Sequence, residues 1–123
     1  MSKAEIDVLK VFVKSALRPN ARPLFQISFG PVRINFSRQE WFKDNVAIQA
    51  NAREFRLIQY FFEHEGEVIS REQLLREVWK FTTTPNTRSV DNYILTLRKK
   101  IEPNPAKPQH LFTLRNAGYK FVR

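Results

Sequence analysis

The side chains of this chain best suited to chemistry are cationic and polar, and they gather toward its C-terminal end. Three cations stand in a row at Arg98, Lys99 and Lys100, and a second group places Arg115 beside Asn116. Arginine and lysine pair with phosphates, whereas Arg, Asn and Thr form hydrogen bonds with the edges of bases. These residue types favour a surface that contacts nucleic acid.

The distribution of charge agrees with such a surface. The chain of 123 residues has a formal net charge of +9, and residues 81–123 hold eight Lys or Arg against two Asp or Glu. A clustered cationic surface attracts polyanions, nucleic acid first and anionic membranes second. Charge alone is equally compatible with a basic surface that only contacts solvent. The arrangement of the cations must therefore distinguish a binding surface from a solvated one.

Composition argues against several other kinds of site. The sequence has no cysteine, and we expect its two histidines, His64 and His110, at the surface or in turns. Its three glycines form no phosphate-binding loop, and Glu63, Glu65 and Glu67 are interpreted as a solvated acidic turn. We therefore expect no enzymatic activity, cofactor or metal. The absence of a long apolar stretch and of an export signal predicts a cytoplasmic protein.

The elements that must position the cations begin with a small sheet and two capped helices. Within residues 24–49, "FQISF", "VRINF", "EWF" and "VAIQA" predict antiparallel strands. Asn51 and Glu54 have the spacing of a capping box, and Ser70 with Gln73 repeats this pattern at the start of a second helix. The buried stripe expected on the first helix consists of Phe55, Ile58 and Phe62.

A third helix, expected to start near Thr87 and to end before Pro103, has two different faces. Four residues at helical spacing predict a core-facing stripe: Val90, Ile94, Leu97 and Ile101. The opposite half carries Arg88, Asn92, Leu95, Thr96 and Lys99. Tyr93, Arg98 and Lys100 fall at the flanks, where they could reach phosphates on either side of a groove.

The last two apolar runs, residues 111–114 and 119–122, predict a β-hairpin whose tip carries Arg115. A small sheet, three helices and a hairpin with a cationic tip make an α+β winged helix. A DNA major groove admits one α-helix, and a neighbouring hairpin can place an arginine in the minor groove. We therefore expect the third helix in the major groove and Arg115 in the minor groove.

Motifs along residues 25–122 resemble the OmpR/PhoB-type effector domain of two-component response regulators. The segments are "IQANAREFRLI", "SREQLLREVW", "TRSVDNYILTLRKKIE" and "LFTLRNAGYKF". The resemblance implies a winged helix with an N-terminal four-stranded antiparallel sheet, a three-helix core and a C-terminal hairpin wing. It further implies sequence-specific promoter binding as a tandem dimer, and contact with RNA polymerase through loop 80–86.

The resemblance also implies roles for individual residues. Trp79 and Arg88 would anchor the domain on the side of the DNA phosphates. Tyr93, Thr96, Arg98 and Lys99 would belong to the recognition helix. The wing would contribute Thr113, Arg115 and Tyr119.

The sequence departs from the family pattern at three places, which concern a helix end, the wing turn and the reading of DNA. Lys80 stands where a helix-ending glycine is common, and Asn116 replaces a wing glycine, although Asn tolerates a positive φ. Leu95 and Thr96 occupy positions where many members carry arginine. We expect recognition to depend more on Asn92, thymine methyl groups, the wing and DNA shape, and hence a different operator.

Two questions of organisation stay open. Residues 1–23, a helix over 4–17 and a proline-containing linker, resemble the tail of a receiver domain, whereas residues 24–123 would form the winged helix. The chain is then either an excised effector domain, which we favour, or a natural protein without phosphorylation control. The alternative function is a winged-helix module for protein interaction or RNA binding, without sequence-specific DNA readout.

Overall fold

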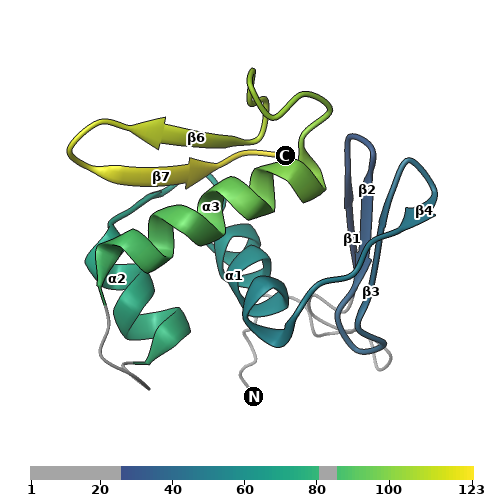
Figure 1. Cartoon of the computed structure of the whole chain (residues 1–123), viewed down its shortest axis with the longest axis horizontal. Coiled ribbons are helices and arrows are strands. Elements are labelled where there is room, and N and C mark those ends of the chain that lie inside the picture. Colours follow the sequence, from purple (N-terminus) through teal and green to yellow (C-terminus); the bar gives the residue numbers. More distant parts are fainter. Residues whose placement is uncertain (1–25, 81–85) are drawn as a thin grey trace, which may run out of the picture.

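The computed structural model describes residues 26–80 and 86–123 (Figure 1), so the helix expected over 4–17 lies outside the described residues. The elements in chain order are β1 (Gln26–Phe29), β2 (Val32–Asn35), β3 (Glu40–Lys43), β4 (Val46–Ala47), α1 (Ala52–Glu63), β5 (Val68–Ile69), α2 (Arg71–Leu74), η1 (Leu75–Trp79), α3 (Thr87–Ile101), β6 (Leu111–Leu114) and β7 (Gly118–Phe121). The expected α+β winged helix is confirmed: a four-stranded sheet, three helices and a C-terminal hairpin.

The N-terminal sheet is antiparallel in the order β1-β2-β3-β4, and it supports the C-terminal end of α3. Asp44 and Asn45 both adopt positive φ, of 53° and 64°, in the tight turn between β3 and β4. Trp41 Nε1 donates to the carbonyl of Lys100 at 3.2 Å, and Lys43 Nζ donates to that of Lys99 at 3.0 Å. These bonds satisfy carbonyls in the last turn of α3, which lack a partner within the helix.

Helix α1 begins with the predicted capping box. Asn51 Oδ1 accepts from the Glu54 N–H, and Glu54 Oε1 accepts from the Asn51 N–H, each at 2.8 Å. The predicted buried stripe is only partly right, because Phe62 is half-buried while Leu57 and Phe61 are fully buried. The fully buried face is therefore set by Leu57, Ile58 and Phe61 together with Phe55.

The second helix starts at the predicted cap, where Ser70 Oγ accepts from the Gln73 N–H at 3.0 Å. It continues from α2 into η1, whose turns are wider and of π type. The helix ends at Lys80, which takes the left-handed conformation with φ 56°. Lys80 thus terminates the helix with the backbone geometry that glycine adopts most easily.

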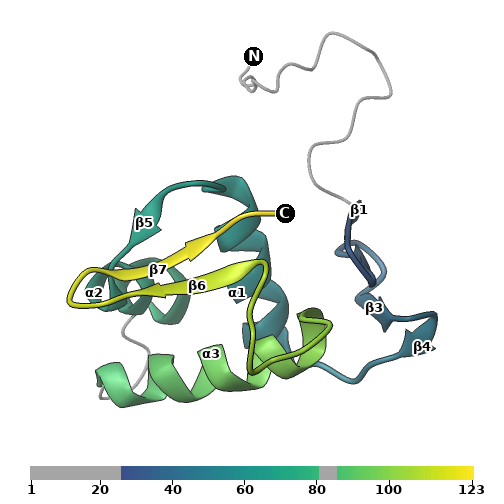
Figure 2. The same cartoon turned by 90° about the horizontal axis from the view of Figure 1, so that it is seen from above.

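The C-terminal hairpin is part of a three-stranded sheet, β5-β7-β6 (Figure 2). Its third strand, β5, was not predicted from the sequence, and it pairs with β7 through Ile69 opposite Tyr119. Gly118 makes this pairing possible: its φ is 138°, and a Cβ there would lie 2.0 Å from the Ile69 carbonyl oxygen. The wing is thereby fixed to the helical core at its base.

The segment between α3 and β6 contains two buried polar residues. Glu102 accepts hydrogen bonds from the backbone N–H groups of Gln109, His110 and Leu111 at 2.8–3.0 Å. His110 was expected at the surface or in a turn: it does lie in the connection between α3 and β6, but it is buried there, at 8% exposed, and packs edge-on against Phe29 at 4.9 Å. Phe29 from the distant β1 and Phe121 from β7 pack against its ring, although its neighbours in the sequence include polar residues.

Candidate nucleic-acid interface

Helix α3 has the two faces that its sequence predicts. Val90, Ile94, Leu97 and Ile101 are each no more than 1% exposed. On the other side, the exposed residues are Arg88, Asn92, Leu95 and Lys99, and Thr96 is half-buried. Asn86 caps the first turn, its Oδ1 accepting from the Ser89 N–H at 2.9 Å. The helix therefore presents a polar surface along its length while its apolar stripe holds it in the core.

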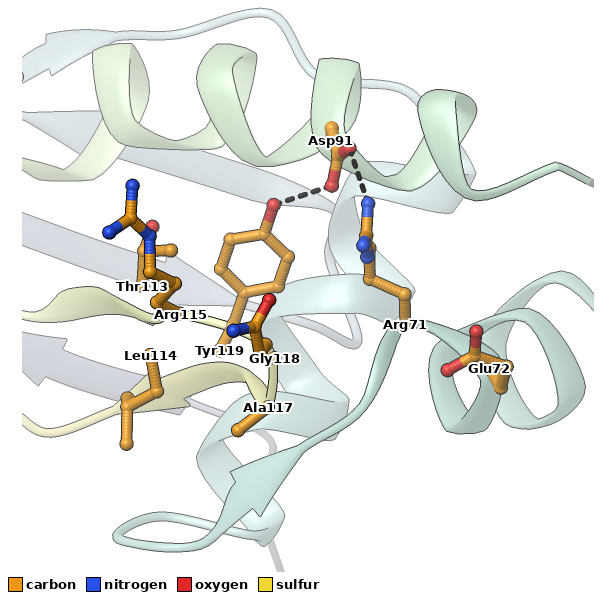
Figure 3. A pocket seen from close by; sticks show the side chains of 10 residues that line it. Arg71, Glu72, Asp91, Thr113, Leu114, Arg115, Ala117, Gly118 and Tyr119 are labelled. Carbon is orange, nitrogen blue, oxygen red and sulfur yellow. Dashed lines mark hydrogen bonds and ion pairs between the residues drawn. The ribbon is translucent and has the colours of Figure 1, made fainter.

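One flank of α3 is tied to the wing through Asp91. Its Oδ1 accepts from the Tyr119 hydroxyl at 2.6 Å, and its Oδ2 accepts from Arg71 Nη1 at 3.0 Å (Figure 3). Burial, reinforced by the bond to Asp91, raises the pKa of Tyr119 to about 12, so the hydroxyl stays protonated and donates. Three elements, α2, α3 and β7, are thus joined by one carboxylate.

A second tie on the same flank comes from Arg98. Its Nε donates to the Leu111 carbonyl at 3.0 Å, and its Nη2 donates to Thr113 Oγ1 at 2.7 Å. The guanidinium also lies 5.9 Å from the centre of the Tyr119 ring. Arg98 and Thr113, both predicted to contact DNA, are therefore already bonded to each other and fix the spacing between α3 and β6.

The opposite flank of α3 is tied to α1. Lys100 Nζ contacts both carboxylate oxygens of the buried Glu54 at 2.9 Å and the Gln49 carbonyl at 2.7 Å. The Tyr93 hydroxyl accepts from Asn51 Nδ2 at 3.3 Å. Lys100 thus serves the fold, and its side chain is 21% exposed.

Trp79 and Tyr119 are buried, at 3% and 8% exposed, so little of either ring is accessible to DNA. Trp79 packs edge-on against Tyr93 at 5.2 Å, and the Arg53 guanidinium lies 5.1 Å from its ring centre. Both aromatic rings support neighbouring residues of the interface: Trp79 supports Tyr93, and Tyr119 supports Asp91.

Three predicted cations remain available to a ligand. Within residues 26–80 and 86–123, the side chains of Arg88, Lys99 and Arg115 form no ion pair or hydrogen bond, and all three are exposed. Arg115 stands at the tip of the β6–β7 hairpin, next to Asn116, whose φ of 64° shapes the turn. The hairpin runs beside α3 with its tip toward the N-terminal half of the helix (Figure 1).

A hollow of about 430 Å³ lies between the wing tip and the start of α2 and α3. Arg71 and the hydrogen-bonded pair Asp91 and Tyr119 line it together with Arg115 of the wing tip (Figure 3). Across residues 26–80 and 86–123, no group of His, Cys, Asp or Glu could hold a metal ion. In the same part of the chain, no helix is long and apolar enough to cross a membrane.

Sequence reasoning missed the roles of Asp91, Arg71 and Glu54, which hold the elements of the interface together through ion pairs and hydrogen bonds within the domain. Asp91 carried a usable signal, because it is the one acidic side chain of the basic helix Thr87–Ile101. Arg71 and Glu54 carried none, since their partners lie on other elements.

The family model for the C-terminal domain of transcriptional regulatory proteins matches residues 45–121, more than half of the chain. The chain belongs to this family. Among curated relatives, the sensory transduction protein RegX3 of Mycobacterium leprae is 37% identical over 91 residues, covering 74% of this chain and 46% of the relative. The probable transcriptional regulator ycf27 of Cyanophora paradoxa is 32% identical, covering 92% and 52%. The chain therefore spans about half the length of these relatives.

Solved structures of family members agree with this assignment. The response regulator DrrB of Thermotoga maritima, an OmpR/PhoB homologue, superposes with a TM-score of 0.72 at 26% identity, covering 100% of this chain and 64% of that one. The RstA DNA-binding domain of Klebsiella pneumoniae, solved in complex with the RstA box, gives a TM-score of 0.67 at 30% identity, covering 79% and 96%.

Proposed function

We propose that this domain binds double-stranded promoter DNA sequence-specifically and regulates transcription as the output domain of a response regulator. One observation carries the proposal. Arg88 and Lys99 of α3 and Arg115 of the wing are exposed and have no side-chain partner among the described residues, and one network of hydrogen bonds holds their two elements together. An α-helix fits the major groove, so α3 would read base edges while Arg115 enters the neighbouring minor groove.

The contacts within the interface divide its residues by role. Arg88, Asn92, Leu95, Thr96, Lys99, Arg115 and Asn116 would meet the DNA. Tyr93, Arg98, Lys100, Thr113, Trp79 and Tyr119 would mainly hold the two reading elements, because each already has a partner within the domain. This division assigns fewer side chains to direct DNA contact than the sequence motifs imply.

Further parts of the proposal concern partners and organisation. Residues 24–123 would form the DNA-binding domain of a non-enzymatic cytoplasmic regulator, with residues 1–23 as a linker from a preceding domain. Loop 80–86, between η1 and α3, would contact RNA polymerase, and two domains would bind in tandem on direct repeats. The support is the family membership alone, because residues 81–85 of this loop lie outside the described residues.

Selection from a random DNA pool, followed by titration at several salt concentrations, tests the proposal. We expect enrichment of direct repeats about one helical turn apart. Lys99→Ala and Arg115→Ala should each weaken binding and reduce the slope of log K against log[salt] by about 1. If both variants bound with unchanged affinity and salt slope, or if no motif were enriched, the proposal would be wrong.

The alternative, an RNA-binding or protein-interaction module, is favoured by one observation only. Leu95 is 58% exposed in the middle of the proposed reading surface, where a hydrophobic contact with a protein could form. A module of that kind would bind the selected duplex no better than an unrelated duplex at the same salt concentration.

A further inference from the structure

Leu95 is an apolar side chain exposed within a polar helix face. It is 58% exposed, whereas Leu97 of the same helix is fully buried. The other large apolar side chains exposed in the described part of the chain, Val46 and Val68, lie on β4 and β5, edge strands of the two sheets. Leu95 is the member of this group that stands near the middle of α3.

The four residues three or four positions from Leu95 restrict what can reach it. Asp91 and Arg98 are bonded to the wing, through Tyr119 and Thr113. Asn92 and Lys99 are exposed, and their side chains form no hydrogen bond or ion pair within the described residues. A ligand that contacts Leu95 therefore also meets one amide and one ammonium group, which suits a polyanion with hydrogen-bonding edges.

Base edges in the DNA major groove offer one apolar group, the C5-methyl of thymine. Asparagine, three residues before Leu95, is the side chain that pairs bidentately with adenine. We propose that Leu95 reads a thymine by packing against its C5-methyl group, and so makes an A·T pair part of the operator. This inference rests on the proposed function, because it requires α3 in the major groove.

The size of the effect follows from the area of one methyl group. Removing a methyl-sized apolar group from water changes an equilibrium by about fourfold. Replacing the thymine by uracil removes only this methyl and leaves base pairing and the minor groove unchanged. The wing contacts proposed for Arg115 should therefore be insensitive to the replacement.

The test uses the duplex that the domain selects from a random pool and replaces each thymine by uracil in turn. For the unaltered protein, we expect about fourfold weaker binding at one position in each half-site and no change in the flanks. Leu95→Ala should bind thymine and uracil equally at that position, whereas Leu95→Met, which keeps an apolar side chain, should retain the preference. The matched control is Val46→Ala, at a residue that is 62% exposed but lies on β4, and it should behave like the unaltered protein.

The outcomes separate this inference from the function on which it rests. If no single uracil weakens binding, or if Leu95→Ala keeps the full preference for thymine, the inference is overturned and the proposed function stands. If the unaltered protein selects no duplex at all, the proposed function fails, and the inference fails with it. Because Leu95 is largely exposed, the variants should unfold at the same urea concentration as the unaltered protein, which excludes misfolding as the cause.

Discussion

The Tyr119 hydroxyl donates a hydrogen bond of 2.6 Å to Asp91 Oδ1, and this contact joins the wing to α3. The same carboxylate receives Arg71 from α2 at 3.0 Å. Helix α3 and the β6–β7 wing, which would both contact DNA, are thereby held at a fixed distance before any DNA is present. Preorganisation of this kind reduces the conformational entropy that is lost on binding.

Tyr119→Phe should loosen the wing without emptying the core, because the ring remains. A hydrogen bond to a charged group contributes about 1.5–3 kcal/mol, so the free energy of unfolding should fall by an amount in that range. Affinity for the selected duplex should also fall, since the wing is then less well positioned relative to α3. Urea denaturation and DNA titration at one salt concentration measure the two effects.

Tyr60→Phe is the matched control for this change. The Tyr60 hydroxyl accepts from Gln73 Nε2 at 2.7 Å between α1 and α2, away from the wing. Its removal should lower stability but leave DNA affinity unchanged. Equal losses of affinity in both variants would show that Tyr119 acts through overall stability alone.

Alkaline pH should weaken the fold through the same tyrosine. Burial and the bond to Asp91 raise the pKa of Tyr119 from 10.0 to about 12. The unfolded chain then releases this proton at lower pH than the folded chain does, so the contribution is complete below pH 10.0 and is lost as pH rises to about 12.

Measurement of this loss requires a comparison, because other groups titrate in the same range. The free energy of unfolding should fall more steeply above pH 10.0 for the unaltered protein than for Tyr119→Phe. The phenolate absorbance, taken as the difference between the two proteins, should rise near pH 12. A rise near the ordinary value would contradict the buried, hydrogen-bonded hydroxyl.

Local patterns predicted the helices, the N-terminal strands and the C-terminal hairpin, but not strand β5 or all of the contacts between elements. Periodicity predicted the stripe of α3, and the capping residues Asn51 and Ser70 predicted two helix starts, because these signals act within one turn. The burial of His110 was not predicted, because residues that pack against it, such as Phe29, come from a distant strand. The role of Asp91 depends on partners from two other elements, so its sequence neighbours could not reveal it.

Lys99 and Lys100 are adjacent, yet the structure gives them opposite roles. Lys100→Met should leave the buried carboxylate of Glu54 without its cation. The loss of stability should be about 2 kcal/mol, below the 3–5 kcal/mol of fully buried pairs because the Lys100 side chain is 21% exposed. Lys99→Met should change stability by less than about 0.5 kcal/mol.

DNA binding should show the reverse order for the same two variants. Lys99→Met should reduce the salt slope by about 1, whereas Lys100→Met should leave the slope unchanged. Both replacements keep an unbranched side chain of nearly the same length and remove only the charged end, so a difference between them reports the ammonium groups. A reduced slope for Lys100→Met alone would assign the phosphate contact to Lys100 instead.

Lys80 and Asn116 both hold a left-handed backbone, with φ of 56° and 64°, at positions where glycine would do so without strain. This conformation costs most non-glycine residues about 1–2 kcal/mol, whereas Asn adopts it more readily. Glycine also adds freedom to the unfolded chain, which offsets about 0.4–1 kcal/mol of the gain. Lys80→Gly should therefore raise the free energy of unfolding by about 0.5 kcal/mol, and Asn116→Gly should leave it unchanged or slightly lower. Urea denaturation of the two variants in parallel measures the difference, and a larger gain at Asn116 would contradict the assignment of strain to Lys80.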